Sequence, residues 1–184
     1  MKNLHKNKKG FTLVESLVAI SLVLVGVTAA FSAAQGGLSA NSSVRNRITA
    51  AFLAQEAMEG VKNIKDTTLL AIAFDTSGSP PTWLSGVPQA CINPSSNPNT
   101  ACAYDIQNLG SVYNCTSQGC QVNLDLNGFY RQSNAAVGAS TGFVRRIRIE
   151  ETVPGREASV TVTVTKETGN FTPYVLTSYM YNWF

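Results

Sequence analysis

The stretch that decides the fold is KKGFTLVESLVAISLVLVGVTAAFSAA, residues 8–34, in which a basic end leads into a long apolar run. No charged residue occurs from position 16 to position 44. As a helix, these roughly 29 residues would rise about 43 Å, which exceeds the hydrocarbon core of a bilayer, about 30 Å. The sequence therefore predicts a helix that can span a membrane.

The charges beside this run predict how it is oriented. Four of the 14 Lys and Arg residues lie within residues 1–10, so residues 11–184 are nearly balanced, with 10 basic against 11 acidic side chains. Because basic flanks stay in the cytoplasm, we expect residues 1–10 inside and the bulk of the chain outside. The one histidine, His5, also lies in the basic end. The rest of the chain therefore offers no histidine for catalysis or for a metal.

Glu15 interrupts the apolar pattern near its start. An ionised side chain at bilayer depth costs on the order of 2.5–3.5 kcal/mol on insertion scales, so it normally has a partner. Alternatively, Glu15 lies at the membrane interface, where the N-terminal end of a helix tolerates a carboxylate. Composition leaves both interpretations open.

The segment KKGFTLVE, residues 8–15, resembles the class III leader and cleavage site of type IV pilins and pseudopilins. The similarity covers a short basic leader, the Gly10-Phe11 junction, an acid at the fifth mature position and the apolar helix behind it. It implies that a membrane-embedded prepilin peptidase cuts after Gly10 and methylates the new amine of Phe11. It also implies that Glu15 pairs with the Phe11 ammonium of a neighbouring subunit, so that two charges that are costly alone neutralise each other.

A conventional secretory signal is the ordinary alternative, since Thr28-Ala29-Ala30 and Ser32-Ala33-Ala34 have the small residues of its cleavage site. Glu15 argues against it, because an acid at the entrance of the apolar region has no use in a disposable signal. The family's major pilins often have a helix-breaking proline in the membrane half, and residues 11–66 contain none. This absence is compatible with a minor pilin or pseudopilin.

The helix is expected to continue beyond the membrane as an amphipathic shaft. One apolar stripe at spacings of three or four residues comprises Ala50, Leu53, Ala57, Val61 and Ile64. We therefore predict a leader at 1–10, a transmembrane half at 11–38, an amphipathic half at 39–66 and a globular head at 67–184. The glycine pair at 36–37 predicts a kink or a locally melted turn, because each glycine costs about 1 kcal/mol relative to alanine.

The head is predicted to be an antiparallel sheet packed on the helix, which makes the fold class α+β. Residues 75–101 contain five prolines and are expected to form a long loop. Alternating patterns then predict strands at 120–126, 129–131, 143–152, 160–164 and 174–183. The dipeptide Asn127-Gly128 predicts a hairpin, and Pro154-Gly155 a further turn.

Four cysteines lie beyond the membrane by the orientation argument, where disulfides are favoured. We favour Cys91–Cys102 and Cys115–Cys120, because local pairing would staple two irregular segments. A zinc site of four thiolates is the rival, although the spacing contains no C-x2-C knuckle. A catalytic thiol is not expected, since no histidine is available to activate it.

Two smaller patterns have plain explanations. Residues 123–128, NLDLNG, match the opening of a calcium loop, but position 12 of that pattern is Asn134 in place of the required glutamate. A hairpin explains them better. Arg145-Arg146-x-Arg148 is basic, yet a strand divides it and leaves Arg146 and Arg148 beside Glu150, which favours a solvated face over a nucleic-acid site.

Three functional classes follow from these patterns. The leading one is a structural subunit, a minor pilin-like protein of the inner or cytoplasmic membrane that an assembly platform draws into a surface or periplasmic filament. A pseudopilin of a type II secretion system shares almost all its features. The second class is a filament-tip adhesin or DNA-uptake subunit. The third is an enzyme, which is not expected, because the adjacent acids at 150–151 point to opposite strand faces. No cofactor is expected.

The N-terminal GFTLVESLVAI and the C-terminal YVLTSYMYNWF look most like a minor pilin of the pilus-modification type. The close resemblance covers residues 1–65, and the head is assigned by pattern alone. The sequence leaves open which machine uses the protein, its position in a filament and any ligand of the head. Expected partners are the prepilin peptidase, other pilin or pseudopilin subunits, the assembly platform and the lipid bilayer, with nucleic acid a weaker candidate.

Overall fold

The computed structural model describes residue 10 and residues 12–76, 82–93, 101–107, 110–115, 119–133 and 138–183. Phe11, and the predicted loop at 77–81 and 94–100, lie outside the described residues. The chain divides into two compact units, residues 1–45 and residues 46–184. One helix, α1 (Leu13–Ala73), runs through both units, which are considered one at a time.

In the first unit, Thr12 begins the helix as its N-cap. The amide of Glu15 donates to Thr12 Oγ1 at 3.3 Å, and the amide of Ser16 donates to the Thr12 carbonyl at 3.1 Å. The helix continues without a break through the glycine pair at 36–37, so the prediction of a locally melted turn there is wrong. The glycine penalty is small compared with the propagation of a helix of 61 residues.

In the second unit, α1 extends past its predicted end at Asp66 to Ala73. The apolar stripe continues, since Leu69 is only 6% exposed and Ile72 packs against the core. Thr68 adds a hydrogen bond from its hydroxyl to the carbonyl of Ile64, at 2.8 Å. The predicted stripe is confirmed, because four of its members are buried and the fifth packs against the core: Ala50, Leu53, Ala57 and Val61, with Ile64.

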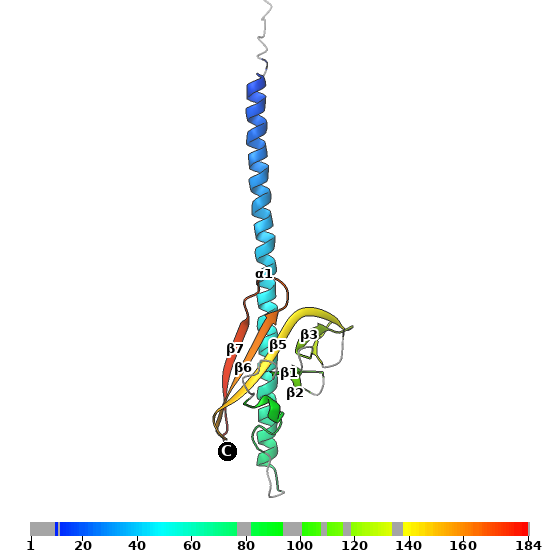
Figure 1. Cartoon of the computed structure of the whole chain (residues 1–184), viewed down its shortest axis with the longest axis vertical. Coiled ribbons are helices and arrows are strands. Elements are labelled where there is room, and N and C mark those ends of the chain that lie inside the picture. Colours follow the sequence, from blue (N-terminus) through cyan, green and yellow to red (C-terminus); the bar gives the residue numbers. More distant parts are fainter. Residues whose placement is uncertain are drawn as a thin grey trace, which may run out of the picture. The chain divides into compact units, whose positions relative to one another are not determined.

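A seven-stranded antiparallel sheet completes the second unit. Its strands are β1 (Ala101–Asp105), β2 (Ser111–Cys115), β3 (Gln121–Leu124), β4 (Tyr130–Gln132), β5 (Ala139–Val153), β6 (Glu157–Lys166) and β7 (Tyr174–Tyr181). The long strand β5 pairs with β6 on one side and with β1 and β3 on the other, and β7 pairs with β6. Figure 1 shows β5, β6 and β7 alongside the second half of α1. The predicted α+β class is confirmed.

The alternating strands match their predicted faces. In β6, Val160, Val162 and Val164 are buried and the threonines between them are only partly covered. The predicted strand at 120–126 is shorter, because Asp125 turns the chain: its Oδ1 accepts the amides of Asn127 and Phe129, both at 2.9 Å. The hairpin between β3 and β4 is confirmed.

Two strands and one packed segment differ from the expectation from sequence. β1 and β2 were not predicted, and every residue of β1 is buried, so it shows no alternation. The expected loop at 75–101 is packed in part, because Trp83, Leu84 and Val87 join the core and a 3-10 turn (Gln89–Cys91) follows. The prolines of this segment predict a loop, but the apolar residues between them pack into the core.

Candidate assembly segment and head cluster

The start of α1 brings together the described members of the predicted processing and assembly site. Gly10 is exposed, and a side chain added to it would meet open space. Glu15 lies in the first helical turn and is exposed. Within the described residues its carboxylate has no salt bridge. Among the described residues, therefore, nothing obstructs Gly10 and no cation pairs with the Glu15 carboxylate, which is free for another partner.

The part of α1 that follows Glu15 is not covered by the rest of the described chain. From position 12 to position 45, every residue whose side chain is described is exposed, including Leu13 at 78% and Phe31 at 64%. By length and composition, this helix is long and apolar enough to cross a membrane, and its most apolar 18-residue stretch has a mean hydropathy of 2.3. Hydroxyls within it are satisfied locally, as Ser21 donates to the carbonyl of Val18 at 2.8 Å. Such a surface fits membrane anchoring.

The head contains a buried guanidinium for which the sequence predicted no role. Arg145 of β5 is 1% exposed. Its Nη1 lies 3.4 Å from Glu56 Oε2 and donates to the Leu53 carbonyl at 2.8 Å, both on α1. Its Nη2 donates to the Tyr104 carbonyl at 2.6 Å, and its Nε donates to Gln132 Oε1 at 2.7 Å. Arg145 therefore joins α1, β1, β4 and β5 through one side chain.

The electrostatics of this Arg145 cluster follow from burial. Desolvation lowers the pKa of Arg145, while the charge of Glu56 and its hydrogen bond oppose that change. An arginine remains protonated in proteins, so the charge persists and needs its partner. Burial likewise raises the pKa of the neighbouring Tyr113 and Tyr104. A second ion pair joins β4 to β1: Arg131 Nη2 lies 3.0 Å from Oδ2 of the buried Asp105.

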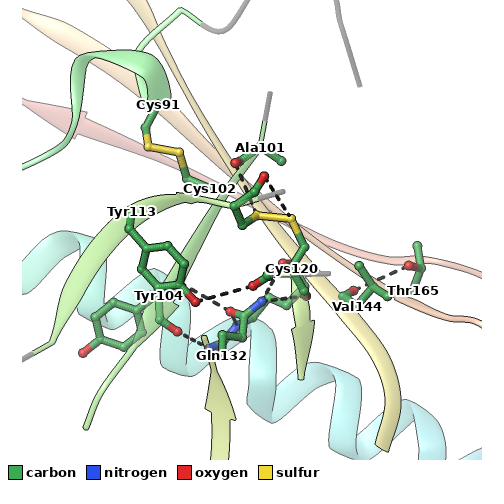
Figure 2. The surroundings of a disulfide bond; sticks show 12 residues. Cys91, Ala101, Cys102, Tyr104, Tyr113, Cys120, Gln132, Val144 and Thr165 are labelled. Carbon is green, nitrogen blue, oxygen red and sulfur yellow. Dashed lines mark hydrogen bonds between the residues drawn. A yellow bond between two sulfur atoms is a disulfide. The ribbon is translucent and has the colours of Figure 1, made fainter. Parts of the chain in front are cut away.

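The four cysteines form two sulfur bridges in the head. Cys91 is bonded to Cys102 with their Cα atoms 5.7 Å apart, and Cys115 to Cys120 with theirs 5.3 Å apart. These are the two pairs that local spacing favoured. Figure 2 shows both bridges close together, with Cys120 beside Gln132, whose Nε2 donates to the Cys120 carbonyl at 2.7 Å. The first bridge connects the turn before β1 to β1, and the second connects β2 to the start of β3.

The basic pattern Arg145-Arg146-x-Arg148 is divided between the two faces of β5, as expected. Arg145 is buried, whereas Arg146 and Arg148 lie on the other face of β5 with partial exposure. Glu150 shares that face and is exposed. The described part of the head therefore presents two arginines beside an acid, with no broad cationic surface on this strand.

Comparison with known proteins gives one result. Residues 5–31 match the family described as the prokaryotic N-terminal methylation motif. No curated protein and no solved structure matches the chain. The motif covers the basic leader, the Gly10-Phe11 junction, Glu15 and the first part of α1. It marks a class III prepilin leader, the kind found in type IV pilins and pseudopilins, and such a leader implies processing by a prepilin peptidase and assembly with other pilin subunits.

Proposed function

We propose that this protein is a minor pilin-like structural subunit, cleaved after Gly10, methylated on Phe11 and assembled into a type IV pilus or related filament. The observation that carries the proposal is the methylation motif at residues 5–31, together with the part of α1 up to residue 45, whose described apolar side chains are all exposed. Such a helix requires lipid or other helices around it. When a subunit leaves the bilayer for a filament, its helix moves from contact with lipid to contact with other helices.

The proposed route begins in the inner or cytoplasmic membrane, with the leader in the cytoplasm and the head outside. After cleavage, the ammonium of Phe11 is the only new charge at the start of the mature chain. Glu15 of a neighbouring subunit neutralises it when the assembly platform draws the subunit into the filament. The free, exposed carboxylate of Glu15 supports this role, since no cation within the described residues of its own chain occupies it.

The head's cysteines fit the same route. We propose that they are oxidised after export as Cys91–Cys102 and Cys115–Cys120, the pairs that lie within bonding distance. Exported proteins encounter an oxidising environment, and closing such short loops is worth about 2–3 kcal/mol in the chain-entropy model. Non-reducing peptide mapping tests this, and four alkylatable thiols or bound zinc would contradict it.

A pseudopilin of a type II secretion system shares these features, and a tip adhesin or DNA-uptake subunit shares the helix. Gene neighbourhood separates the machines: a retraction ATPase nearby favours a pilus, and an outer-membrane secretin with several pseudopilins favours secretion. The arginines of β5 lie beside Glu150, which gives nucleic acid little support. The structural role in a filament remains our proposal.

Two measurements test it. Intact-mass analysis of the membrane-extracted protein should show loss of residues 1–10 and gain of one methyl group. A mature end near Phe31 or Gln35 would show a secreted product instead. Gly10→Val should block cleavage without affecting the head, because within the described residues nothing lies close enough to Gly10 to clash with the larger side chain, whereas the peptidase must accommodate it.

The second measurement counts tagged variants in sheared filaments and in the membrane fraction, in a background without the wild-type copy. Glu15→Ala should insert and be cleaved, yet its recovery in filaments should fall, since a buried charge without its partner costs about 3–5 kcal/mol. Ser16→Ala, a polar neighbour in the same turn, is the matched control and should assemble normally. Equal recovery of Glu15→Ala and wild type would remove the proposed role of this carboxylate.

A further inference from the structure

The last strand of the chain, β7, is an unusually open edge of the sheet. It pairs with β6 over eight consecutive residues in regular register, and within the described residues no strand lies on its other side. The other edges are short: β2 has five residues and ends at the bonded Cys115, and β4 has three. Figure 1 shows β7 at the margin of the sheet. The sheet therefore has one long free edge among its described strands.

Among the described residues, this edge shows none of three features that normally prevent strand addition: charged side chains, a bulge or a proline within the strand. Residues 168–184 contain no Asp, Glu, Lys or Arg. No bulge interrupts the pairing of β7, and its one nearby proline, Pro173, lies before the strand. A long, regular, uncharged edge strand presents a row of unpaired backbone N–H and C=O groups. These groups can be satisfied by an extended segment of another polypeptide.

The side chains of β7 provide an apolar surface next to that edge. Met180 is buried on the core face, whereas Val175, Thr177, Tyr179 and Tyr181 are exposed on the opposite face. The Thr177 hydroxyl lies 3.2 Å from that of Thr161 on β6, which fixes the two on the same face. An added strand would place its own β-branched or aromatic side chains beside this row, where cross-strand pairs contribute about 0.2–1 kcal/mol each.

We propose that β7 receives an extended, uncharged segment of a neighbouring filament subunit, which adds to the sheet as an eighth strand. The partner is defined by its chemistry: a free backbone edge, few charges, and β-branched or aromatic side chains at alternate positions. This inference rests on the proposed function, because the partner is a filament subunit. It adds a contact between heads to the contact made by Glu15.

Hydrogen exchange of β7 tests the inference directly. Every second amide of an antiparallel edge strand points away from its neighbour. In the full chain extracted in detergent these outward amides should exchange quickly. In the same protein within sheared filaments, the exchange rate of these outward amides should fall at least about tenfold. The amides of β6, which are already paired on both sides, should change little. The alternation distinguishes strand addition from general crowding.

A matched pair of variants separates the edge from the face. Thr177→Glu places a charge on the edge strand, and Thr163→Glu places the same charge on the same face of β6, inside the sheet. Thr177→Glu should lower recovery in filaments several-fold, and Thr163→Glu should not. Equal loss in both variants would indicate a partner on the face and would overturn the inference.

The outcomes also separate this inference from the proposed function. Protein present in filaments with unprotected β7 amides would refute strand addition and leave the subunit role intact. Protein absent from filaments altogether would refute the subunit role, and strand addition by a filament subunit with it. Protein present in filaments with alternate amides protected supports both.

Discussion

The two parts of α1 belong to one helix but differ in what covers their side chains. From Thr12 to Arg45 the described side chains are exposed, and large apolar residues occur all around the helix. From Asn46 to Ala73 only one stripe is apolar and buried, and small residues such as Ala50, Ala54 and Ala57 let the sheet approach closely. A helix that is apolar all round serves an environment of lipid or other helices, whereas a striped helix serves its own core.

The largest expected effect is confined to the packed part. Glu56→Ala leaves the buried Arg145 guanidinium without its ionic partner, so it should destabilise the head by about 3–5 kcal/mol. The control is Glu59→Ala, one turn along α1, whose side chain is 76% exposed and has Lys62 as its one ionic partner among the described residues. That variant should change stability by less than about 1 kcal/mol. Thermal unfolding of the full chain followed by near-UV circular dichroism measures both, and similar losses would show that the cluster is unimportant.

Loss of the first sulfur bridge is expected to come next. Replacing both Cys91 and Cys102 with serine removes a closed loop with a separation of 11 residues, worth about 3 kcal/mol in the chain-entropy model. The pair Cys115 and Cys120, with a separation of five, should cost about 2 kcal/mol. Urea midpoints of the head should follow this order while membrane insertion is unchanged. A reversed order would mean that strain or residual unfolded structure dominates.

One substitution should have opposite effects in the two parts of α1. At Gly60 an added methyl group would collide with the Tyr104 ring, so Gly60→Ala should destabilise the head by about 1–3 kcal/mol. At Gly26 nothing lies nearby, so Gly26→Ala should leave the head unchanged and favour the helix by up to about 1 kcal/mol. Head unfolding and helical content report the two effects. Destabilisation of the head by Gly26→Ala would contradict the division into two parts.

The smallest effect is expected at the first turn. Thr12→Ala removes the N-cap hydroxyl that accepts the Glu15 amide, which should cost about 1 kcal/mol locally. The exchange of amides in the first helical turn should accelerate, and the unfolding temperature of the head should not move. Thr12→Ser, which keeps the hydroxyl, is the control and should restore slow exchange.

The features recovered from sequence were those with a local pattern. The helix followed from its period and from the absence of proline, and β5 to β7 followed from alternation and from the Pro154-Gly155 turn. β1 was missed because its residues are all buried and its neighbours irregular. The role of Arg145 was missed because its partners come from distant segments: the Leu53 carbonyl is 92 positions away. A charge on the inward face of a strand was the one available signal.

The motif residues differ from the head in how they could be predicted from the sequence. Gly10 and Glu15 were identified by their register, and both lie within residues 5–31, which match the methylation motif. Their processing and pairing depend on a peptidase and on a second subunit, neither of which is encoded in the fold of one chain. Phe11 lies outside the described residues, so its modification remains a prediction for mass analysis.

The Arg145 cluster has a consequence for sequence variation in the head. Two of its hydrogen bonds go to main-chain oxygens, those of Leu53 and Tyr104. A carbonyl oxygen stays in place when its residue is exchanged for another that follows the same backbone path. The guanidinium therefore constrains the route of the chain more than the identity of the side chains along it. Subunits that retain this arginine and its glutamate can diverge on their outer surfaces while keeping the helix and the sheet in the same register.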